Sequence, residues 1–184
     1  MNLLHDIQHY HPGCEQEARD REAMIRFIQR HDDCLLRSNL IAHFSASVWV
    51  VNPQRTRVLM AYHNLYDSWA WIGGHADGEE DLRAVAMREL QEETGVRHAR
   101  LVSEDIFSLE TLIVHGHEKR GVYVPSHLHM NLTYLAEADE DEALIHAPDE
   151  NQAVKWLTLE EALTLPTEPW MVERIYKKLI DRCR

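Results

Sequence analysis

The stretch from Gly73 to Val96, GGHADGEEDLRAVAMRELQEETGV, constrains this chain most, because it crowds seven carboxylates around one predicted helix. Asp81 is a favoured residue at a helix N-cap, where its carboxylate accepts free backbone N–H groups. Gly95 is the usual kind of residue just past a helix end, where the backbone turns left-handed. These two signals predict a helix from about Leu82 to Thr94.

Three carboxylates continue the apolar side of this helix instead of its solvent side. With 100° per residue and Leu82 at zero, the core stripe lies between about −60° and +80° and contains Val85, Ala86 and Leu90. Glu89, Glu93 and Glu92 fall at about −20°, +20° and −80°, so the three carboxylates continue that stripe one turn further on. A Glu-rich helix is ordinarily a solvated face, and this pattern predicts the opposite orientation.

Carboxylates on the inward side of a helix repel one another and raise each other's pKa unless a cation neutralises them. Mg²⁺ is a natural partner, because it binds carboxylates together with water and substrate phosphate. Arg88 lies four residues before Glu92, so it either orients that carboxylate toward the metal or forms a plain surface ion pair. Glu80 can turn toward the same cation, and Gly73-Gly74 permits close approach of the backbone.

The same stretch resembles the Nudix box, G-x5-E-x7-R-E-U-x-E-E-x-G-U, in which U is a bulky aliphatic residue. Every fixed position is filled at the correct spacing, by Gly74, Glu80, Arg88, Glu89, Leu90, Glu92, Glu93, Gly95 and Val96. Many family members have Gly immediately before the first box Glu, where this chain has Glu79. That departure leaves the position of Glu80 unchanged.

The resemblance implies a Nudix hydrolase with an α/β/α sandwich fold, which cleaves nucleoside diphosphates linked to another moiety with Mg²⁺ or Mn²⁺. It also implies that Glu89, Glu92 and Glu93 are metal ligands, with Glu80 nearby. In the family the general base varies between a box glutamate and a residue on a later loop. Candidates here are Glu93, Glu150 and Glu118, and a solvated turn residue is the alternative for Glu150. Our candidate catalytic set is Glu93, Glu92, Glu89, Arg88 and Glu150.

The rest of the chain predicts an α/β class domain with a mixed sheet. Strand-like runs occur at 43–51, 57–62, 69–72, 99–102, 106–114, from 127 onward and at 153–157, and 115–125 is predicted to be a polar loop. Thr158 to Glu161 is a capping box, and a final helix follows from residue 167. Residues 1–38 are predicted to be an N-terminal helical extension. Its helix is expected to end near His31, and its charged residues are expected to form a solvated face. Residues 39–184 would then form the Nudix hydrolase domain.

Strand alternation predicts a polar face that lines the substrate pocket. His127, His129, Asn131 and Thr133 share one face of their strand, and His43 lies on a polar face of another. We expect His43, His127 and His129 near the phosphate or base, with a solvent-facing sheet as the alternative. A metal site at His127 and His129 is disfavoured, because no third ligand is evident. Trp69 and Trp71 can stack on a base or belong to the core, and Trp71 is our candidate for substrate binding.

The formal net charge of −12 disfavours a nucleic-acid partner and an mRNA-decapping role. It leaves a small phosphorylated substrate as the expected partner, and a homodimer is left open. No membrane span or signal peptide is evident, and three scattered cysteines favour the cytoplasm. The alternatives are a catalytically silent nucleotide-binding regulator on the same fold and an isomerase of the isopentenyl-diphosphate type, which would require a cysteine near the sheet.

Overall fold

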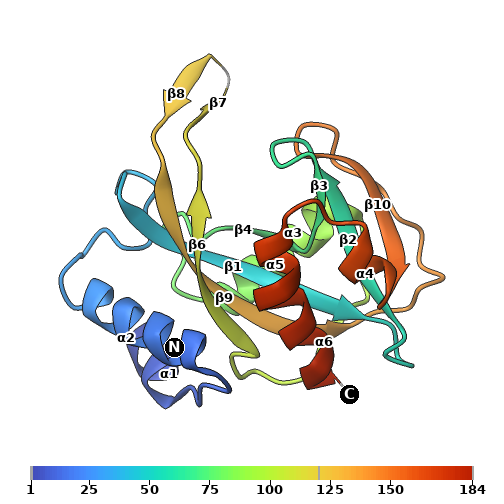
Figure 1. Cartoon of the computed structure of the whole chain (residues 1–184), viewed down its shortest axis with the longest axis horizontal. Coiled ribbons are helices and arrows are strands. Elements are labelled where there is room, and N and C mark those ends of the chain that lie inside the picture. Colours follow the sequence, from blue (N-terminus) through green and yellow to red (C-terminus); the bar gives the residue numbers. More distant parts are fainter. Residues whose placement is uncertain (1, 120, 184) are drawn as a thin grey trace.

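A long parallel strand pair forms the centre of the molecule (Figure 1). In the computed structural model, which describes residues 2–119 and 121–183, β1 (Ala42–Val51) pairs with β9 (His127–Glu137) from Ala42↔Leu128 to Val51↔Glu137. The other strands of this sheet are β2 (Arg57–His63), β3 (Ser68–Ala70), β4 (Ile72–His75), β5 (Arg100–Leu101), β6 (Ser108–Val114) and β10 (Asn151–Thr158).

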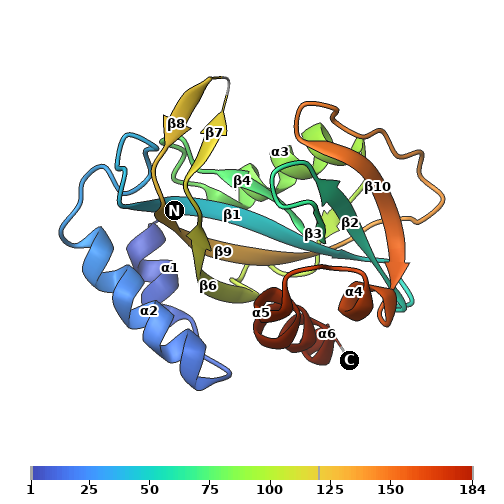
Figure 2. The ribbon, with the colours of Figure 1, turned by 45° about the horizontal axis from the view of Figure 1, so that its top comes forward.

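The sheet is mixed, because the neighbours of the central pair run antiparallel to it. Its main order is β10-β2-β1-β9-β5, while β4 pairs with β1, β3 with β2, and β6 with β9. Helices cover the two faces (Figure 2), and each face has a core of its own. One core joins α3 (Leu82–Thr94) with α1 (Leu3–His9) and α2 (Glu15–Ile28), and the other holds the C-terminal helices. The predicted α/β/α sandwich is therefore confirmed.

The capping signals position α3 as predicted. The carboxylate of Asp81 accepts hydrogen bonds from the backbone N–H of Arg83 at 3.1 Å and of Ala84 at 3.2 Å. Gly95 is left-handed, with φ of 76°, and its N–H bonds to the carbonyl of Gln91. The predicted capping box before α4 (Glu161–Thr164) is also present, since Thr158 and Glu161 exchange hydrogen bonds at 2.8 and 3.2 Å.

Three boundaries differ from the prediction. The run 115–125 is a projecting hairpin, β7 (His117–Lys119) with β8 (Val122–Val124), because Val-Tyr-Val favours a strand and Gly121 adopts a φ of 78° (Figure 1). The run 69–72 divides between β3 and β4, which pair with different strands. The first long helix ends at Ile28, before His31. The final helix consists of α5 (Pro169–Met171), the π-helical turn η1 (Val172–Tyr176) and α6 (Lys177–Cys183).

The charged face of α2 is not wholly solvated, because Glu17 is fully buried. Lys178 Nζ lies 3.0 Å from Glu17 Oε1, and Arg182 forms a short ion pair with the same carboxylate. Burial by itself raises the pKa of Glu17, but hydrogen bonds from Arg182 and Gly13 and the charge of Lys178 outweigh that effect and hold the pKa at about 2. Glu17 thus fastens α2 to the C-terminal helix α6, a long-range pairing that helix periodicity does not reveal.

Within the described part of the chain, no helix is long and apolar enough to cross a membrane.

Candidate active site

Three carboxylates converge at the edge of the sheet. Glu89 and Glu93 project from successive turns of α3, and Glu150 comes from the turn before β10. Each offers one oxygen, and these oxygens all lie within 4.8 Å of one another. A set made only of carboxylate oxygens suits a hard dication such as Mg²⁺, so the donors present fit the metal that the box implies.

Glu93 is held in place although its surroundings disfavour its charge. Its side chain is 3% exposed, and Oε1 accepts the backbone N–H of Gly73 at 3.1 Å. Asn151 fixes the same residue from the other side by donating to its backbone carbonyl at 3.2 Å. Burial raises the pKa of Glu93 to about 8; the Gly73 hydrogen bond opposes the shift and the nearby charges of Glu150 and Glu89 add to it. A bound cation would remove that penalty.

Glu89 explains why glycine stands at position 74. A Cβ on Gly74 would lie 2.3 Å from the carboxyl carbon of Glu89, which real contacts do not allow. The φ of Gly74 is not positive, so close approach is the reason for this residue. Burial raises the pKa of the Glu89 carboxyl, and the hydrogen bond from Arg88 at 2.8 Å opposes that effect.

Arg88 orients Glu89 more directly than Glu92. Its Nη2 donates to Glu89, whereas its Nε lies 3.8 Å from Glu92 Oε1. The Glu92 side chain is 62% exposed, and Glu80 is exposed as well. Among the described residues, neither joins the group of three carboxylates, whose third member is Glu150. The helical wheel predicted that Glu92 continues the inward stripe with Glu89 and Glu93, and the exposure of its side chain departs from that expectation.

The carboxylates lie beside a cleft of about 660 Å³. Cationic side chains reach it from three elements, since Arg88, Arg37 and Lys119 all line it. Glu118 of β7 also lines the cleft, apart from the three converging carboxylates. Arg37 and Lys119 lie outside the box in the sequence and carry no motif, so sequence reasoning missed them.

The aromatic wall of the cleft has a structural role as well. Trp71 is 9% exposed and packs edge-on against Tyr176, with ring centroids 6.0 Å apart. Tyr66 completes this wall near the cleft. Trp71 therefore belongs to the core on one side and borders the cleft on the other, while Trp69 packs against Tyr62.

The polar faces of β1 and β9 are one continuous strip. The hydroxyls of Ser45 and Ser47 donate to Asn131 Oδ1 at 3.1 and 2.9 Å, so these side chains satisfy each other across the strand pair. The strip continues to Thr133, which accepts from Asn131 at 3.2 Å. At its other end it reaches the histidines.

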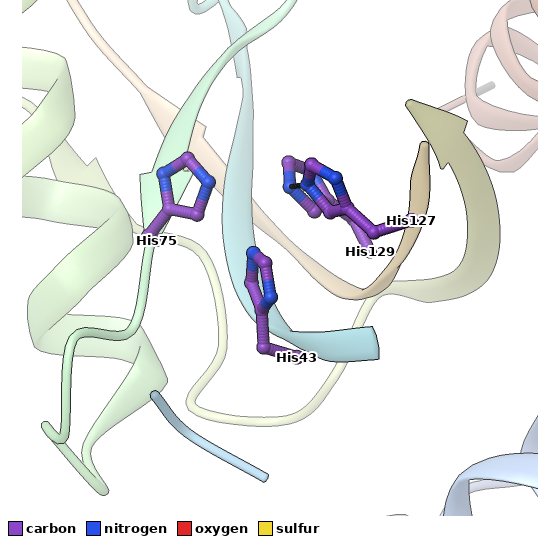
Figure 3. Close-up of side chains that lie close together, drawn as sticks. All are labelled: His43, His75, His127 and His129. Carbon is purple, nitrogen blue, oxygen red and sulfur yellow. Dashed lines mark hydrogen bonds between the residues drawn. The ribbon is translucent and has the colours of Figure 1, made fainter. Parts of the chain in front are cut away.

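His43, His127 and His129 come together as expected, and a fourth ring, His75, joins them (Figure 3). Burial lowers the pKa of His129 to about 2 and of His75 to about 3, so these rings are uncharged at neutral pH. His75 and His129 border the cleft. Sequence reasoning missed His75, because the antiparallel register that sets it beside Ser45 is a tertiary fact.

The family model described as the NUDIX domain matches residues 42–182. A CMP-5'-(N-acetyl-N-hydroxy-3-aminopropyl)phosphonate hydrolase of Streptomyces rubellomurinus is 32% identical over 127 residues, covering 65% of this chain and 54% of that protein. An asymmetrical bis(5'-nucleosyl)-tetraphosphatase of Rattus norvegicus is 35% identical over 98 residues, covering 53% of this chain and 60% of that protein. The chain thus spans little more than half the length of either relative.

Solved structures share the architecture. The C. elegans Ap4A hydrolase binary complex aligns with a TM-score of 0.54 at 22% identity, over 76% of this chain and 93% of that one. The E. coli dihydroneopterin triphosphate pyrophosphohydrolase aligns with a TM-score of 0.54 at 18% identity, over 75% of this chain and 95% of that one. At these identities the likeness shows the fold.

Proposed function

This chain belongs to the Nudix family, and from that premise we propose that it is a metal-dependent pyrophosphohydrolase. Its substrate would be a nucleoside diphosphate linked to another moiety. The observation that carries the proposal is the convergence of Glu89, Glu93 and Glu150 beside a cleft that also holds cationic and aromatic side chains.

Nudix hydrolases generally use divalent metal ions, and we propose Mg²⁺ or Mn²⁺ here, held by Glu89 and Glu93. When bound, the ion supplies charge neutralisation at the phosphoryl oxygens and lowers the pKa of water. Arg88 keeps Glu89 oriented, and the Gly73 N–H keeps Glu93 oriented. Glu92 and Glu80, which the resemblance adds to the ligand set, are exposed and would reach the ion through water or after a change of rotamer.

Glu150 is our choice for the general base. It is the exposed member of the group, on a turn at the cleft, whereas Glu93 is buried. An exposed carboxylate within reach of the metal ligands can accept a proton from the attacking water and pass it to solvent. Glu93 would serve as ligand, and Glu118, across the cleft on β7, would contact the substrate instead.

The cleft supports a nucleotide derivative as substrate. Lys119 offers positive charge to a phosphate chain, and Arg37 and Arg88, which are paired with Asp77 and Glu89, offer further hydrogen-bond donors, in a chain whose overall charge is negative. Trp71 and Tyr66 offer an aromatic border for a base. The two curated relatives are named for a bis(5'-nucleosyl) tetraphosphate and a CMP-phosphonate, so both kinds of compound belong in a substrate panel.

The test is hydrolysis of that panel, with nucleoside triphosphates, nucleotide sugars and ADP-ribose added, in Mg²⁺ and in Mn²⁺. We expect turnover of at least one compound, its loss in Glu93→Gln, and a fall of about 10²–10⁴-fold in kcat for Glu150→Gln with metal binding kept. Asp149→Asn, a change at the neighbouring exposed carboxylate, is the control. Binding without turnover of any compound would favour the silent regulator.

We further propose that residues 1–38 brace the domain formed by 39–184. Ile7 and Met24 are buried in the same core as α3, and Glu17 fastens α2 to α6. The matched family region begins at residue 42, after these helices.

The three cysteines, Cys14, Cys34 and Cys183, are free thiols in the described chain, which supports the cytoplasmic setting that we propose.

A further inference from the structure

Four histidines from three strands form a second cluster of metal-ligating side chains. His43 lies on β1, His75 on β4, and His127 and His129 on β9. One ring nitrogen from each lies within 4.8 Å of the others. Figure 3 shows His43 and His75 directed toward the pair from β9. The proposed catalytic ligands are all carboxylates, so this cluster is a chemically different site.

We propose that these four histidines bind one transition-metal dication of the Zn²⁺ class, separately from the Mg²⁺ held by Glu89 and Glu93. Imidazole nitrogens suit Zn²⁺, Cu²⁺ and Ni²⁺, whereas Mg²⁺ requires oxygen ligands. The ion would join β1, β4 and β9 at the end of the polar strip. Since β4 continues into the loop that leads to α3, the site would fix the start of the Nudix box.

The spacing of the nitrogens fits tetrahedral coordination. His127 Nε2 and His129 Nε2 form a hydrogen bond at 3.2 Å, which the cation would replace (Figure 3). Zn–N bonds of about 2.0–2.1 Å at tetrahedral angles place two ligand nitrogens about 3.3 Å apart. The four nitrogens all lie within 4.8 Å of one another, so the other separations would have to shorten by up to about 1.5 Å to complete such a site.

The outer ring nitrogens are arranged as in known metal sites. His43 Nδ1 lies 3.1 Å from the carbonyl oxygen of Asn39, and His127 Nδ1 lies 2.8 Å from that of Pro125. A carbonyl accepts only from a protonated nitrogen, so both rings carry the proton on Nδ1 and present the lone pair of Nε2 to the cluster. Ligating histidines are usually oriented by this kind of hydrogen bond.

One nitrogen in the cluster lacks the partner that burial requires. His43 Nε2 is inaccessible to solvent and makes no hydrogen bond to any described residue. The side chain of His43 is 3% exposed, so water does not provide an easy substitute. Buried polar atoms are nearly always satisfied, and an exception indicates a ligand that belongs there. The lone pair on this nitrogen is directed to where the cation would bind.

The cluster has cationic neighbours as well as the carboxylate of Asp77: burial lowers the pKa of His75, and the positive charges of Arg37 and Lys119 lower it further. The nearest guanidinium, Arg37, forms a two-point hydrogen-bonded pair with Asp77 through Nε at 2.6 Å and through Nη2. The carboxylate thereby offsets the positive charge. Anions are poor occupants by comparison, because neutral imidazoles offer them few donors once two of the Nδ1 protons are used by backbone carbonyls.

The experiment measures Zn²⁺ in the full chain without a histidine tag. Protein stripped with a chelator is titrated with Zn²⁺ by calorimetry, and bound metal is counted by elemental analysis after gel filtration. Co²⁺ then replaces Zn²⁺, and its visible absorption separates a tetrahedral nitrogen site from an octahedral oxygen site. We expect one tightly held equivalent, an intense tetrahedral Co²⁺ spectrum, and a rise in Tm when the metal is added.

Variants locate the ion. The double change His43→Gln and His129→Gln should remove the bound equivalent of Zn²⁺. If that double variant does not fold, the single change His127→Asn is used instead, and it should weaken Zn²⁺ binding at least tenfold. Glu93→Gln should keep the equivalent although catalysis is lost. A matched control is His5→Gln with His9→Gln, since these exposed rings are also adjacent, with centroids 4.0 Å apart.

Several outcomes would overturn the inference. Wild-type protein that retains no stoichiometric Zn²⁺ would do so, as would a folded double variant that retains it. Loss of the equivalent in Glu93→Gln or in the His5 and His9 control would place the ion elsewhere. Because the readouts are metal content and a spectrum, a failure here is distinguishable from a failure of the hydrolase assignment.

Discussion

Replacing Glu93 by Gln should stabilise the metal-free protein at alkaline pH while removing catalysis. The carboxyl is 3% exposed, and burial raises its pKa from 4.5 to about 8. A raised carboxyl pKa means that the folded state prefers the protonated form, so the stabilising contribution is complete below about pH 4.5 and is lost as the pH approaches about 8. Gln resembles the protonated carboxyl and keeps an acceptor for the Gly73 N–H.

The magnitude follows from proton linkage. Between the two pKa values the folded state binds one more proton than the unfolded state, so the free energy of unfolding falls by about 1.4 kcal/mol for each pH unit. Across the whole interval this amounts to about 5 kcal/mol, which is an upper figure because the folded state can relax. Because the amide of Gln does not titrate, the Glu93→Gln variant lacks this fall in the free energy of unfolding with pH.

The assay is urea unfolding of both proteins in a chelator, at several values from about pH 5 to about pH 8.5. We expect the free energy of unfolding of the variant, relative to that of the wild type, to increase steadily as pH rises. The titration of all other groups is common to both proteins and cancels in this difference. Mg²⁺ should reduce the gap by stabilising only the wild type, since the cation neutralises the Glu93 charge. A difference that does not change with pH would refute the reasoning.

Three further predictions follow from other contacts. Glu17→Ala should lower the free energy of unfolding by about 1.5–3 kcal/mol, because it removes the fully buried carboxylate that pairs with Lys178 and Arg182; a loss under about 1 kcal/mol in urea unfolding would mean that the pair behaves as a surface ion pair. Gly74→Ala should reduce kcat at least a hundredfold, because the added Cβ would lie 2.3 Å from the Glu89 carboxyl carbon and displace that side chain, and unchanged kinetics would contradict that role. Asp81→Ala should cost about 1 kcal/mol through the lost cap of α3, and thermal unfolding at equal Mg²⁺ would show it.

The sequence by itself determined the helix that carries the site. Local signals set its ends at Asp81 and Gly95, and helical periodicity put Glu89 and Glu93 on its inward side. Local signals also placed the central strands, since β1 and β9 alternate over their length. These features could be predicted because each depends on residues close in the chain.

Only the tertiary structure decided which distant residues meet. Glu150 joins Glu89 and Glu93 although it lies 57 residues beyond Glu93 in the chain, and Arg37 and Lys119 reach the cleft from separate segments. His75 joins His43 and His129 because β4 and β9 pair with opposite edges of β1 in registers that alternation does not fix. Periodicity determines which way a side chain faces along its own element. Register and packing, which depend on long-range contacts, determine what lies opposite that side chain.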